Sequence, residues 1–347
     1  MKKWLVLGFL IMGLAFADSP IDGLTLALHP EGEWLIAGGK NRTLYKLDAE
    51  TLEVMERSYF GSTINRLAFS ADGKVLFLQD SEPDIYVLAA DTLKVVKTLG
   101  GYGAMQLAPA ANLLLAYNDN YNGDTLTLFD MKGNEIQSLT FGEEDDIASV
   151  GISPDGSKVA VFFDSFDSEN EEDVSWSDIP DEYEGFAKDV YAEQNDGEEA
   201  RYILYSLPEL EVLADYVGFY TPYDDQLVFF QGDDALIINS SNENARYSLD
   251  GTVEMWEWPG NSSGYGRGVS LDHNVLVVGG LADATIYDFA ASSESSFDID
   301  DVPGASEYFV SFVVADDGTI YGSTEGYRVV KVKQAGAGVS KTVQPVY

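Results

Sequence analysis

Short apolar segments alternate with polar, glycine-containing turns along nearly the whole chain. Residues 64–99 show one complete unit: 64–70 alternates between apolar and polar positions, 74–79 is an apolar run, 84–89 is rich in β-forming residues, and 93–99 closes the unit. Short apolar runs bounded by Gly, Asp and Pro are typical of β-strands. No stretch carries a sustained apolar stripe with helical spacing, so the pattern predicts an all-β protein.

A turn rich in Asp, Gly and Pro recurs seven times and marks a repeated unit. The turns begin at His29, Ser70, Ala108, Ser153, Gln231, Leu271 and Ala315. The intervals between them are 41, 38, 45, 78, 40 and 44 residues, and one insertion explains the long interval. A period of about 40 residues is what the four strands of a propeller blade require. The spacing therefore predicts one seven-bladed β-propeller of four-stranded antiparallel blades over residues 18–347, because such sheets bury both faces only in a closed ring.

The repeats resemble those of the WD40 and YVTN-type repeat propellers. The resemblance rests on the turn Ser153-Pro154-Asp155-Gly156 and its equivalents, and on the stretch Leu47–Val54, which is echoed by Leu88–Val95. The Gly-His and Trp-Asp dipeptides of WD40 repeats are absent from this sequence. The resemblance implies the architecture alone, because propellers of this kind serve as scaffolds, lectin-like binders, redox subunits and occasional hydrolases.

The N-terminus has the pattern of a secretory signal peptide. Lys2 and Lys3 precede an apolar run over residues 4–16, which closes on Ala15-Phe16-Ala17. This arrangement predicts a signal peptide at residues 1–17 and a periplasmic or secreted protein, with an N-terminal membrane anchor as the alternative. No later segment approaches the roughly 20 apolar residues that a spanning helix needs, so we expect no membrane insertion. The chain contains no cysteine, which excludes disulfides and thiolate chemistry.

The charge of the chain is strongly negative. The sequence has 59 acidic and 20 basic residues, a formal net charge of −39 at pH 7. Such a charge repels phosphates, so we expect no nucleic acid partner, and it favours basic protein surfaces or cations. Adaptation to a salty medium is an alternative explanation of the same acidity. We expect the closed propeller to be a monomer.

Aromatic residues gather in the connections between successive units. If each blade runs from its innermost to its outermost strand, these connections share one face with the loops between second and third strands. The candidate ligand-binding residues on this face are Tyr59, Tyr102, Phe141, Tyr220, Trp258, Tyr265 and Tyr308. Aromatic rings with polar tips are common in binding surfaces. The alternative is that these rings wedge between blades as ordinary core.

The insertion lies in the fourth unit, over about residues 164–200, between strands predicted at residues 158–163 and 201–207, and is dominated by carboxylates. Its aromatic residues, including Trp176, are interleaved with the acidic ones. Long loops in compact domains are usually functional or disordered. The insertion is therefore either a lid or docking element for a cationic partner, with Trp176 a further ligand-binding candidate, or a solvated acidic loop.

One polar loop has the spacing of a calcium site. Asn118, Asn120, Asn122 and Asp124 provide side-chain oxygens at every second position, and Gly123 stands at the bend. Oxygen-rich calcium loops use this spacing. The bidentate Glu of a full EF-hand loop is absent, and Phe129 stands in its place. A tight polar turn explains the same residues, so calcium is one of two interpretations.

The catalytic motifs of the sequence give little support for an enzyme. Gly260-Asn261-Ser262-Ser263-Gly264 has the Gly-x-Ser-x-Gly spacing, but a nucleophile elbow joins a strand to a helix, and the pattern predicts no helix there. His-Glu-x-x-His and a phosphate-binding glycine loop are absent, and the two histidines, His29 and His273, fall in the repeated turns. We expect an exported, non-enzymatic binding propeller that engages a protein, peptide or saccharide through an aromatic and acidic loop face. The alternative is a YVTN-like hydrolase of the lactone-opening type, with carboxylates and a divalent cation at the central mouth.

Overall fold

The structure of the protein is a computed structural model. It describes residues 23–118, 124–142, 147–163, 166–167, 198–218, 227–231, 235–239, 244–248, 253–256, 266–299, 307–335 and 338–346. Within these ranges the chain forms strands, turns and bends and no helix, as the hydrophobic pattern predicts. The predicted signal peptide lies outside the described residues.

Four of the sheets are antiparallel and four-stranded, with their strands in chain order. The first contains β1 (Leu24–Leu28), β2 (Trp34–Gly39), β3 (Thr43–Asp48) and β4 (Val54–Tyr59). The second contains β5 (Ile64–Phe69), β6 (Val75–Asp80), β7 (Asp84–Ala89) and β8 (Lys94–Gly100). The third contains β9 (Ala104–Ala108), β10 (Leu113–Asn118), β11 (Thr125–Asp130) and β12 (Glu135–Thr140). Another contains β18 (Leu227–Gln231), β19 (Ala235–Asn239), β20 (Asn244–Ser248) and β21 (Val253–Trp256).

Two sheets are larger. One contains β13 (Ile147–Ile152), β14 (Lys158–Phe163), β16 (Glu198–Ser206) and β17 (Val212–Gly218), with the short β15 (Phe166–Asp167) paired to the start of β16. The other has eight strands, β22 (Gly266–Val269), β23 (Val275–Gly279), β24 (Asp283–Asp288), β25 (Ser293–Asp298), β26 (Phe309–Val314), β27 (Ile320–Thr324), β28 (Arg328–Ala335) and β29 (Gly338–Pro345). Its two antiparallel halves meet where β22 and β26 share one parallel residue pair, Arg267 with Ser311, and at the isolated bridge between Leu281 and Tyr308.

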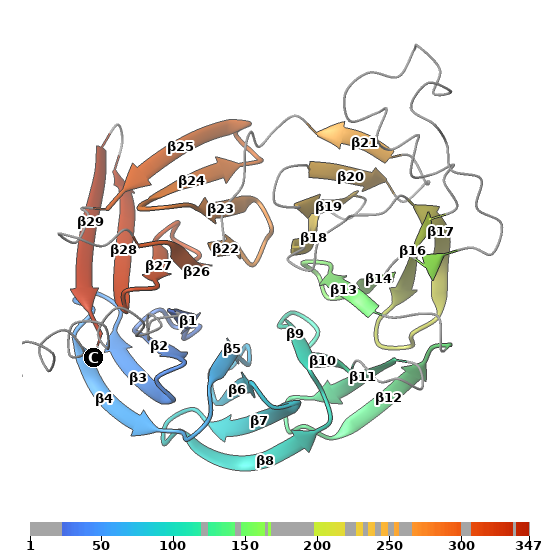
Figure 1. The fold of residues 1–347 in the computed structure, drawn as a ribbon, viewed down its shortest axis with the longest axis horizontal. Coiled ribbons are helices and arrows are strands. Elements are labelled where there is room, and N and C mark those ends of the chain that lie inside the picture. The colour runs from blue at the N-terminus through green and yellow to red at the C-terminus, as the bar shows by residue number, and fades with distance from the viewer. Residues whose placement is uncertain are drawn as a thin grey trace, which may run out of the picture.

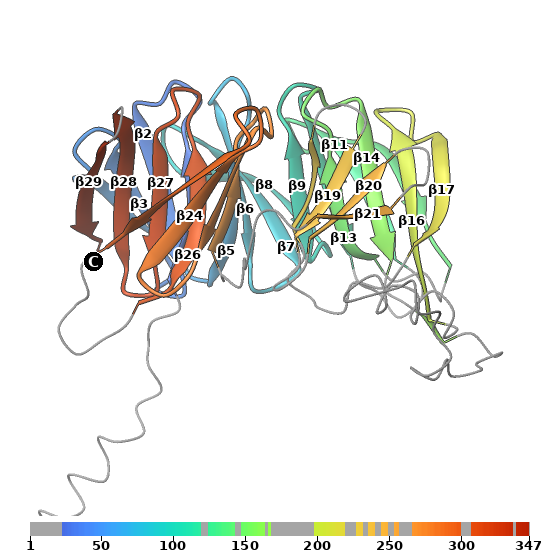
Figure 2. The same cartoon turned by 90° about the horizontal axis from the view of Figure 1, so that it is seen from above.

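The sheets stand side by side around a central axis, so the fold is propeller-like (Figures 1 and 2). In each four-strand run the first strand is innermost and the last is outermost (Figure 1). We call turn face the end where the first strand turns into the second and the third into the fourth, at residues 29–33 and 49–53 of the first sheet. The opposite end, at residues 40–42 and 60–63, is the loop face. All seven turns found in the sequence join a first strand to a second.

The core lies between neighbouring sheets. One cluster joins the first and second sheets and includes Ile36, Leu44 and Leu76, each at most 1% exposed. Another joins the third sheet to the β13–β17 sheet through Leu126, Val159 and other buried side chains. Because each sheet presents apolar residues on both faces, the sheets are stable only when packed radially.

The repeated turns are built from local hydrogen bonds. In the second sheet the Ser70 hydroxyl donates to Asp72 Oδ1 (2.8 Å), and Val75 N donates back to Ser70 Oγ (3.0 Å). Lys74 N donates to the same carboxylate oxygen (3.1 Å), and Gly73 takes a positive φ of 68°. The same Ser-x-Asp arrangement recurs at Ser153 and Ser270. These side chains compete successfully for backbone donors, which is why the turn repeats so faithfully in the sequence.

The turn from the third to the fourth strand explains the echo between Leu47–Val54 and Leu88–Val95. Asp48 Oδ1 accepts hydrogen bonds from Glu50 N (2.9 Å) and Thr51 N (2.7 Å). The next residue, Leu52, adopts a φ of 62° and buries its side chain completely. Leu93 and Leu210 repeat this left-handed, buried leucine. The leucine of each of these turns is thus part of a hydrophobic core cluster.

The outermost strands of four consecutive sheets carry a β-bulge near their start, at the second or third residue. The pairing of β3 with β4 skips Met55, and β7 with β8 skips Val96. The pairing of β11 with β12 skips Ile136, and β16 with β17 skips Leu213. A bulge twists an edge strand and interrupts its row of unpaired backbone groups, which protects the edge from pairing with another chain.

The ring closes without exchange of strands between its first and last sheets. β1–β4 and β26–β29 are each continuous in sequence, and they meet through side chains. Leu24 and Leu26 of β1 pack with Tyr321 and Val329 in one buried cluster. The Tyr321 hydroxyl donates to Ala49 O (3.1 Å). This contact is the seam of the ring.

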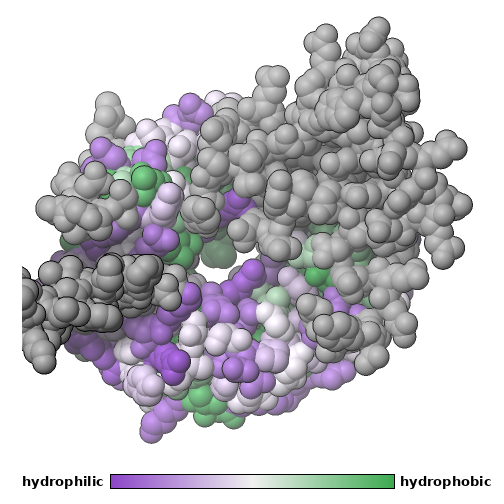
Figure 3. Space-filling model, viewed as in Figure 1, coloured by the Kyte–Doolittle hydropathy of each residue, from purple (hydrophilic) through white to green (hydrophobic). Residues whose placement is uncertain are grey.

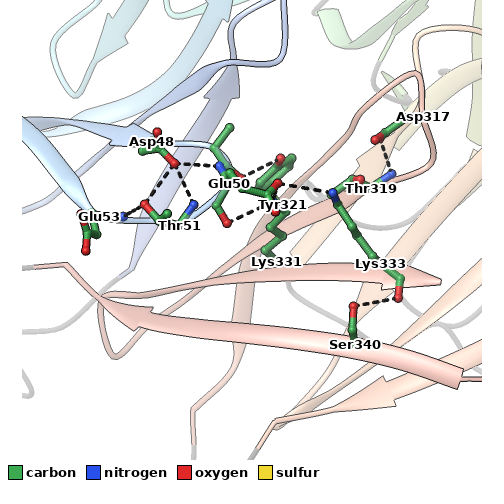
Figure 4. Close-up of polar contacts among 11 residues, drawn as sticks. Asp48, Glu50, Thr51, Glu53, Asp317, Thr319, Tyr321, Lys331, Lys333 and Ser340 are labelled. Carbon is green, nitrogen blue, oxygen red and sulfur yellow. Dashed lines mark hydrogen bonds and ion pairs between the residues drawn. The ribbon is translucent and has the colours of Figure 1, made fainter. Parts of the chain in front are cut away.

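A buried lysine adds polar contacts to the seam (Figure 4). Lys331 Nζ, with 5% of its side chain exposed, donates to Glu50 O (3.1 Å) and pairs with Glu50 Oε2 (2.5 Å). Lys333 Nζ lies 3.4 Å from the same carboxylate oxygen. The hydrogen bond and charge of Lys331 hold the pKa of Glu50 below its usual value. Glu50 is 76% exposed, so this ion pair is screened by solvent.

Candidate binding surfaces

The turn face carries a repeated set of ionised carboxylates. Hydrogen bonds from the Lys74 side chain and amide and the Ser70 hydroxyl lower the pKa of Asp72 to about 2. Hydrogen bonds from the Ser153 and Ser157 hydroxyls lower the pKa of Asp155 to about 2. The pKa of Asp272 and that of Asp317 are lowered by equivalent turn hydrogen bonds. These carboxylates hold the turns, and they also leave negative charge on the surface at each of them.

Among the predicted aromatic residues of the loop face, Tyr59 is the most exposed in the described part of the chain, at 73%. Tyr102 is half-buried, its ring meeting Phe129 of the next sheet edge-on at 5.4 Å. Phe141 is also half-buried and meets Phe163 in the same way at 5.0 Å. Tyr308 is half-buried, and its backbone forms an isolated antiparallel β-bridge with Leu281. Tyr102 and Phe141 thus wedge between sheets while keeping an exposed edge.

The other predicted ligand-binding residues, Trp176, Tyr220, Trp258 and Tyr265, lie outside the described residues. So does most of the acidic insertion. Its flanks are described: β14 occupies the predicted 158–163, whereas β16 begins three residues before the predicted Arg201. The extra residues pair with β15, Phe166 with Glu199 and Asp167 with Glu198.

The candidate calcium loop is described at its two ends only. Asn118 Oδ1 accepts a hydrogen bond from Thr125 N (2.8 Å), and Asp124 Oδ2 accepts one from Ile147 N (2.6 Å). Asp124 has no exposed surface. Both side chains therefore hold backbone groups, as a polar turn requires. Asn120 and Asn122 lie outside the described residues.

The two histidines lie at contacts between sheets, a role that the sequence does not reveal. His29 stacks on Trp34 (4.5 Å) and meets Phe69 of the second sheet edge-on (5.4 Å). His273 Nδ1 lies 2.7 Å from Phe230 O, on the sheet that precedes its own in the chain. Desolvation by burial lowers the pKa of His273. The nearest signal in the sequence is that His29 occupies a turn position at which three other turns carry serine, namely Ser70, Ser153 and Ser270.

Polar side chains of the innermost strands reach across to the next sheet. Arg66 Nη1 of β5 donates to Met105 O of β9 (3.2 Å), and Gln106 Nε2 of β9 donates to Val150 O of β13 (2.6 Å). Backbone groups that face the central opening are thereby paired. On the loop face, hydrophilic residues surround much of the visible mouth of that opening (Figure 3).

The described residues contain no group of three or more His, Cys, Asp or Glu side chains placed to hold a metal ion. Nor does any helix there have the length and apolar character needed to cross a bilayer.

Comparison with known proteins identifies the fold and no family. No family model matches the sequence, and no curated protein matches it. Among solved structures the chain is similar to hydrazine synthase of Kuenenia stuttgartiensis, a protein that contains a β-propeller, with a TM-score of 0.62 and 12% sequence identity. The similarity covers 95% of this chain and 97% of that chain. At this identity it supports the propeller-like architecture alone.

Proposed function

We propose that this chain is an exported, seven-bladed propeller of the WD40 or YVTN-like kind that binds a basic protein or peptide through its acidic loop face. The count of seven takes the two halves of the eight-stranded sheet as separate blades, because β22 and β26 share one parallel residue pair and no continuous ladder. The seven repeated turns, each between a first and a second strand, support the same count.

The unequal distribution of charge carries the proposal. Residues 18–132 have 16 acidic and nine basic side chains, whereas residues 133–347 have 43 acidic and nine basic ones. One part of the ring is therefore far more acidic than the other. A rigid surface with one sign of charge concentrates partners of the opposite sign and speeds their association. The acidic insertion belongs to this part, and Tyr59 and Tyr308 add aromatic surface on the same face.

The first test measures binding of a fluorescent oligolysine peptide, with an oligoglutamate peptide of equal length as the control ligand. We expect binding of oligolysine alone, and an affinity that falls as salt rises above roughly 0.1 M, where screening becomes strong. Equal binding of the two peptides would contradict the proposal. Binding of neither peptide at low salt would also contradict it.

A second test assigns the face. Glu82→Gln with Glu325→Gln removes two charges from the loop face, and Glu31→Gln with Glu33→Gln removes two from the turn face. We expect only the first pair to weaken oligolysine binding. Deletion of residues 167–199 should weaken it further without unfolding the protein, because β14 and β16 pair directly from Lys158–Ser206 to Phe162–Tyr202. A deletion variant that binds as before would show that the insertion does not contact the partner.

A further inference from the structure

The exposed apolar side chains of the described residues are concentrated on one arc of the outer rim. Nine large hydrophobic residues are exposed among the described residues, and seven of them lie on β4, β8, β12 and β17. We call these seven the apolar rim: Met55, Tyr59, Val95, Val96, Ile136, Val212 and Leu213. Their strands are the outermost strands of four consecutive sheets (Figure 1). On β25, the outermost strand of another sheet, the five exposed residues are all polar, and the sixth residue is a buried phenylalanine.

The bulges direct part of this surface outward. Four members of the apolar rim, Met55, Val96, Ile136 and Leu213, are the residues that the strand pairing skips, and their side chains are 49% to 64% exposed. Because a bulge spoils the edge for strand addition, a partner must contact these side chains instead of the backbone. The outer rim curves, so that β4 and β17 lie on different sides of the ring (Figure 1). A contact centred on β8 takes in Met55, Val95, Val96 and Ile136, which expose on the order of 400 Å², about half of the roughly 800 Å² that each partner contributes to a standard interface.

Charge decides which partner fits. β4, β8, β12 and β17 carry three acidic side chains, Glu56, Glu135 and Asp215, and three basic ones, Arg57, Lys94 and Lys97. This arc is therefore neutral in a chain of net charge −39. Another copy of so acidic a protein can approach closely only where the local charge is balanced. Interspersed charges of both signs also suit a two-fold contact, in which each patch meets its own copy.

We propose that the apolar rim is a self-association surface, through which two copies of this chain form a two-fold dimer centred on β8. Val95 and Val96 lie at the centre, at 46% and 64% exposure, with Met55 of β4 on one side and Ile136 of β12 on the other. The acidic loop faces of both copies stay free in this arrangement. The dimer replaces the monomer that the closed ring alone leads us to expect.

Sedimentation equilibrium of the purified protein tests the proposal, over roughly 1 to 100 µM, a range that suits micromolar dissociation constants. We expect a monomer–dimer equilibrium whose dissociation constant falls as sodium chloride rises from about 0.05 to about 1 M, because salt screens the repulsion between the copies. Binding of a basic partner at the loop face weakens over the same salt range. The two proposals therefore fail independently.

Variants locate the contact. Val96→Lys and Met55→Lys should each raise the dissociation constant at least tenfold, whereas Leu271→Lys, at a 62% exposed position on the turn face, should leave it unchanged. Circular dichroism melting of each variant establishes that it is folded. A monomer at every protein and salt concentration would overturn the proposal. A dimer that Val96→Lys and Met55→Lys do not weaken, or that Leu271→Lys weakens equally, would overturn it too.

Discussion

Replacement of Leu24 by Ala tests whether side chains alone hold the seam of the ring. Leu24 lies on β1, has no exposed surface and packs in the cluster that joins the first and last sheets. Its carbonyl also accepts a hydrogen bond from the Ser323 hydroxyl. Leu78→Ala is a matched control, because Leu78 is equally buried but lies in the cluster between the first and second sheets.

The two substitutions should cost a similar global stability. Deletion of a fully buried leucine side chain costs about 3 kcal/mol, within a range of about 2 to 5, and a cost of 3 kcal/mol raises the unfolded fraction roughly 100-fold. Chemical denaturation followed by tryptophan fluorescence measures both values. The two free energies of unfolding can differ within this range because the cavities left by the substitutions collapse to different extents. Global stability alone therefore does not test the seam.

Local opening should distinguish the variants. The chain connects the first and second sheets through residues 60–63. Among the described residues no chain segment connects β1 to the last sheet, which β1 meets through packed side chains and the hydrogen bond from Ser323 to Leu24 O. Because no covalent link holds the sheets together at the seam, the chain gains more conformational entropy when the seam opens than when the first and second sheets separate. Hydrogen exchange of the β1 and β26–β29 amides should speed up in Leu24→Ala at denaturant concentrations too low for global unfolding, and not in Leu78→Ala. Equal exchange of these amides in the two variants would refute the seam as the weakest contact.

Three further predictions concern the turns. Gly32 and Gly73 are equivalent turn residues with φ values of 72° and 68°, but a Cβ at Gly73 would lie 2.2 Å from His29 Nε2, whereas nothing would lie within 4 Å of a Cβ at Gly32. Gly32→Ala should therefore cost about 1 kcal/mol of stability through backbone strain alone, and Gly73→Ala should cost clearly more. Equal melting temperatures of the two variants would contradict this. The lowered pKa values of Asp72 and Asp155 mean that their contribution to stability is complete above their ordinary value of 3.8 and is lost as the pH falls toward about 2, so Asp155→Asn should flatten the acid limb of a melting-temperature profile. The lowered pKa of His273 means that protonation favours the unfolded state as the pH falls below 6.5. His273→Asn, a substitution compatible with the φ of 56°, should reduce the stability that the protein loses between about pH 7 and 5. A melting-temperature profile over this pH range that is the same in the variant would contradict the prediction.

The sequence by itself determined the features that depend on neighbours in the chain. Ser70 and Asp72 bond backbone groups within a few residues, so the turn they form is visible in the sequence wherever it recurs. The alternation of apolar segments and turns likewise determined the strands and their order. The predicted flank of the insertion at residue 201 was three residues late, because β15 extends β16 through a pairing that periodicity does not indicate.

Only the tertiary structure decided what happens between sheets. The role of Tyr102 and Phe141 depends on which ring of the next sheet each one meets, and the wedge contact of Tyr102 involves Phe129, 27 positions away. The bulges that expose Met55 and Val96 arise from a register shift against a neighbouring strand. The seam joins Leu24 to Val329, residues at opposite ends of the chain. Such contacts are fixed by the radial packing of the sheets, which brings together side chains that carry no mutual signal in the sequence.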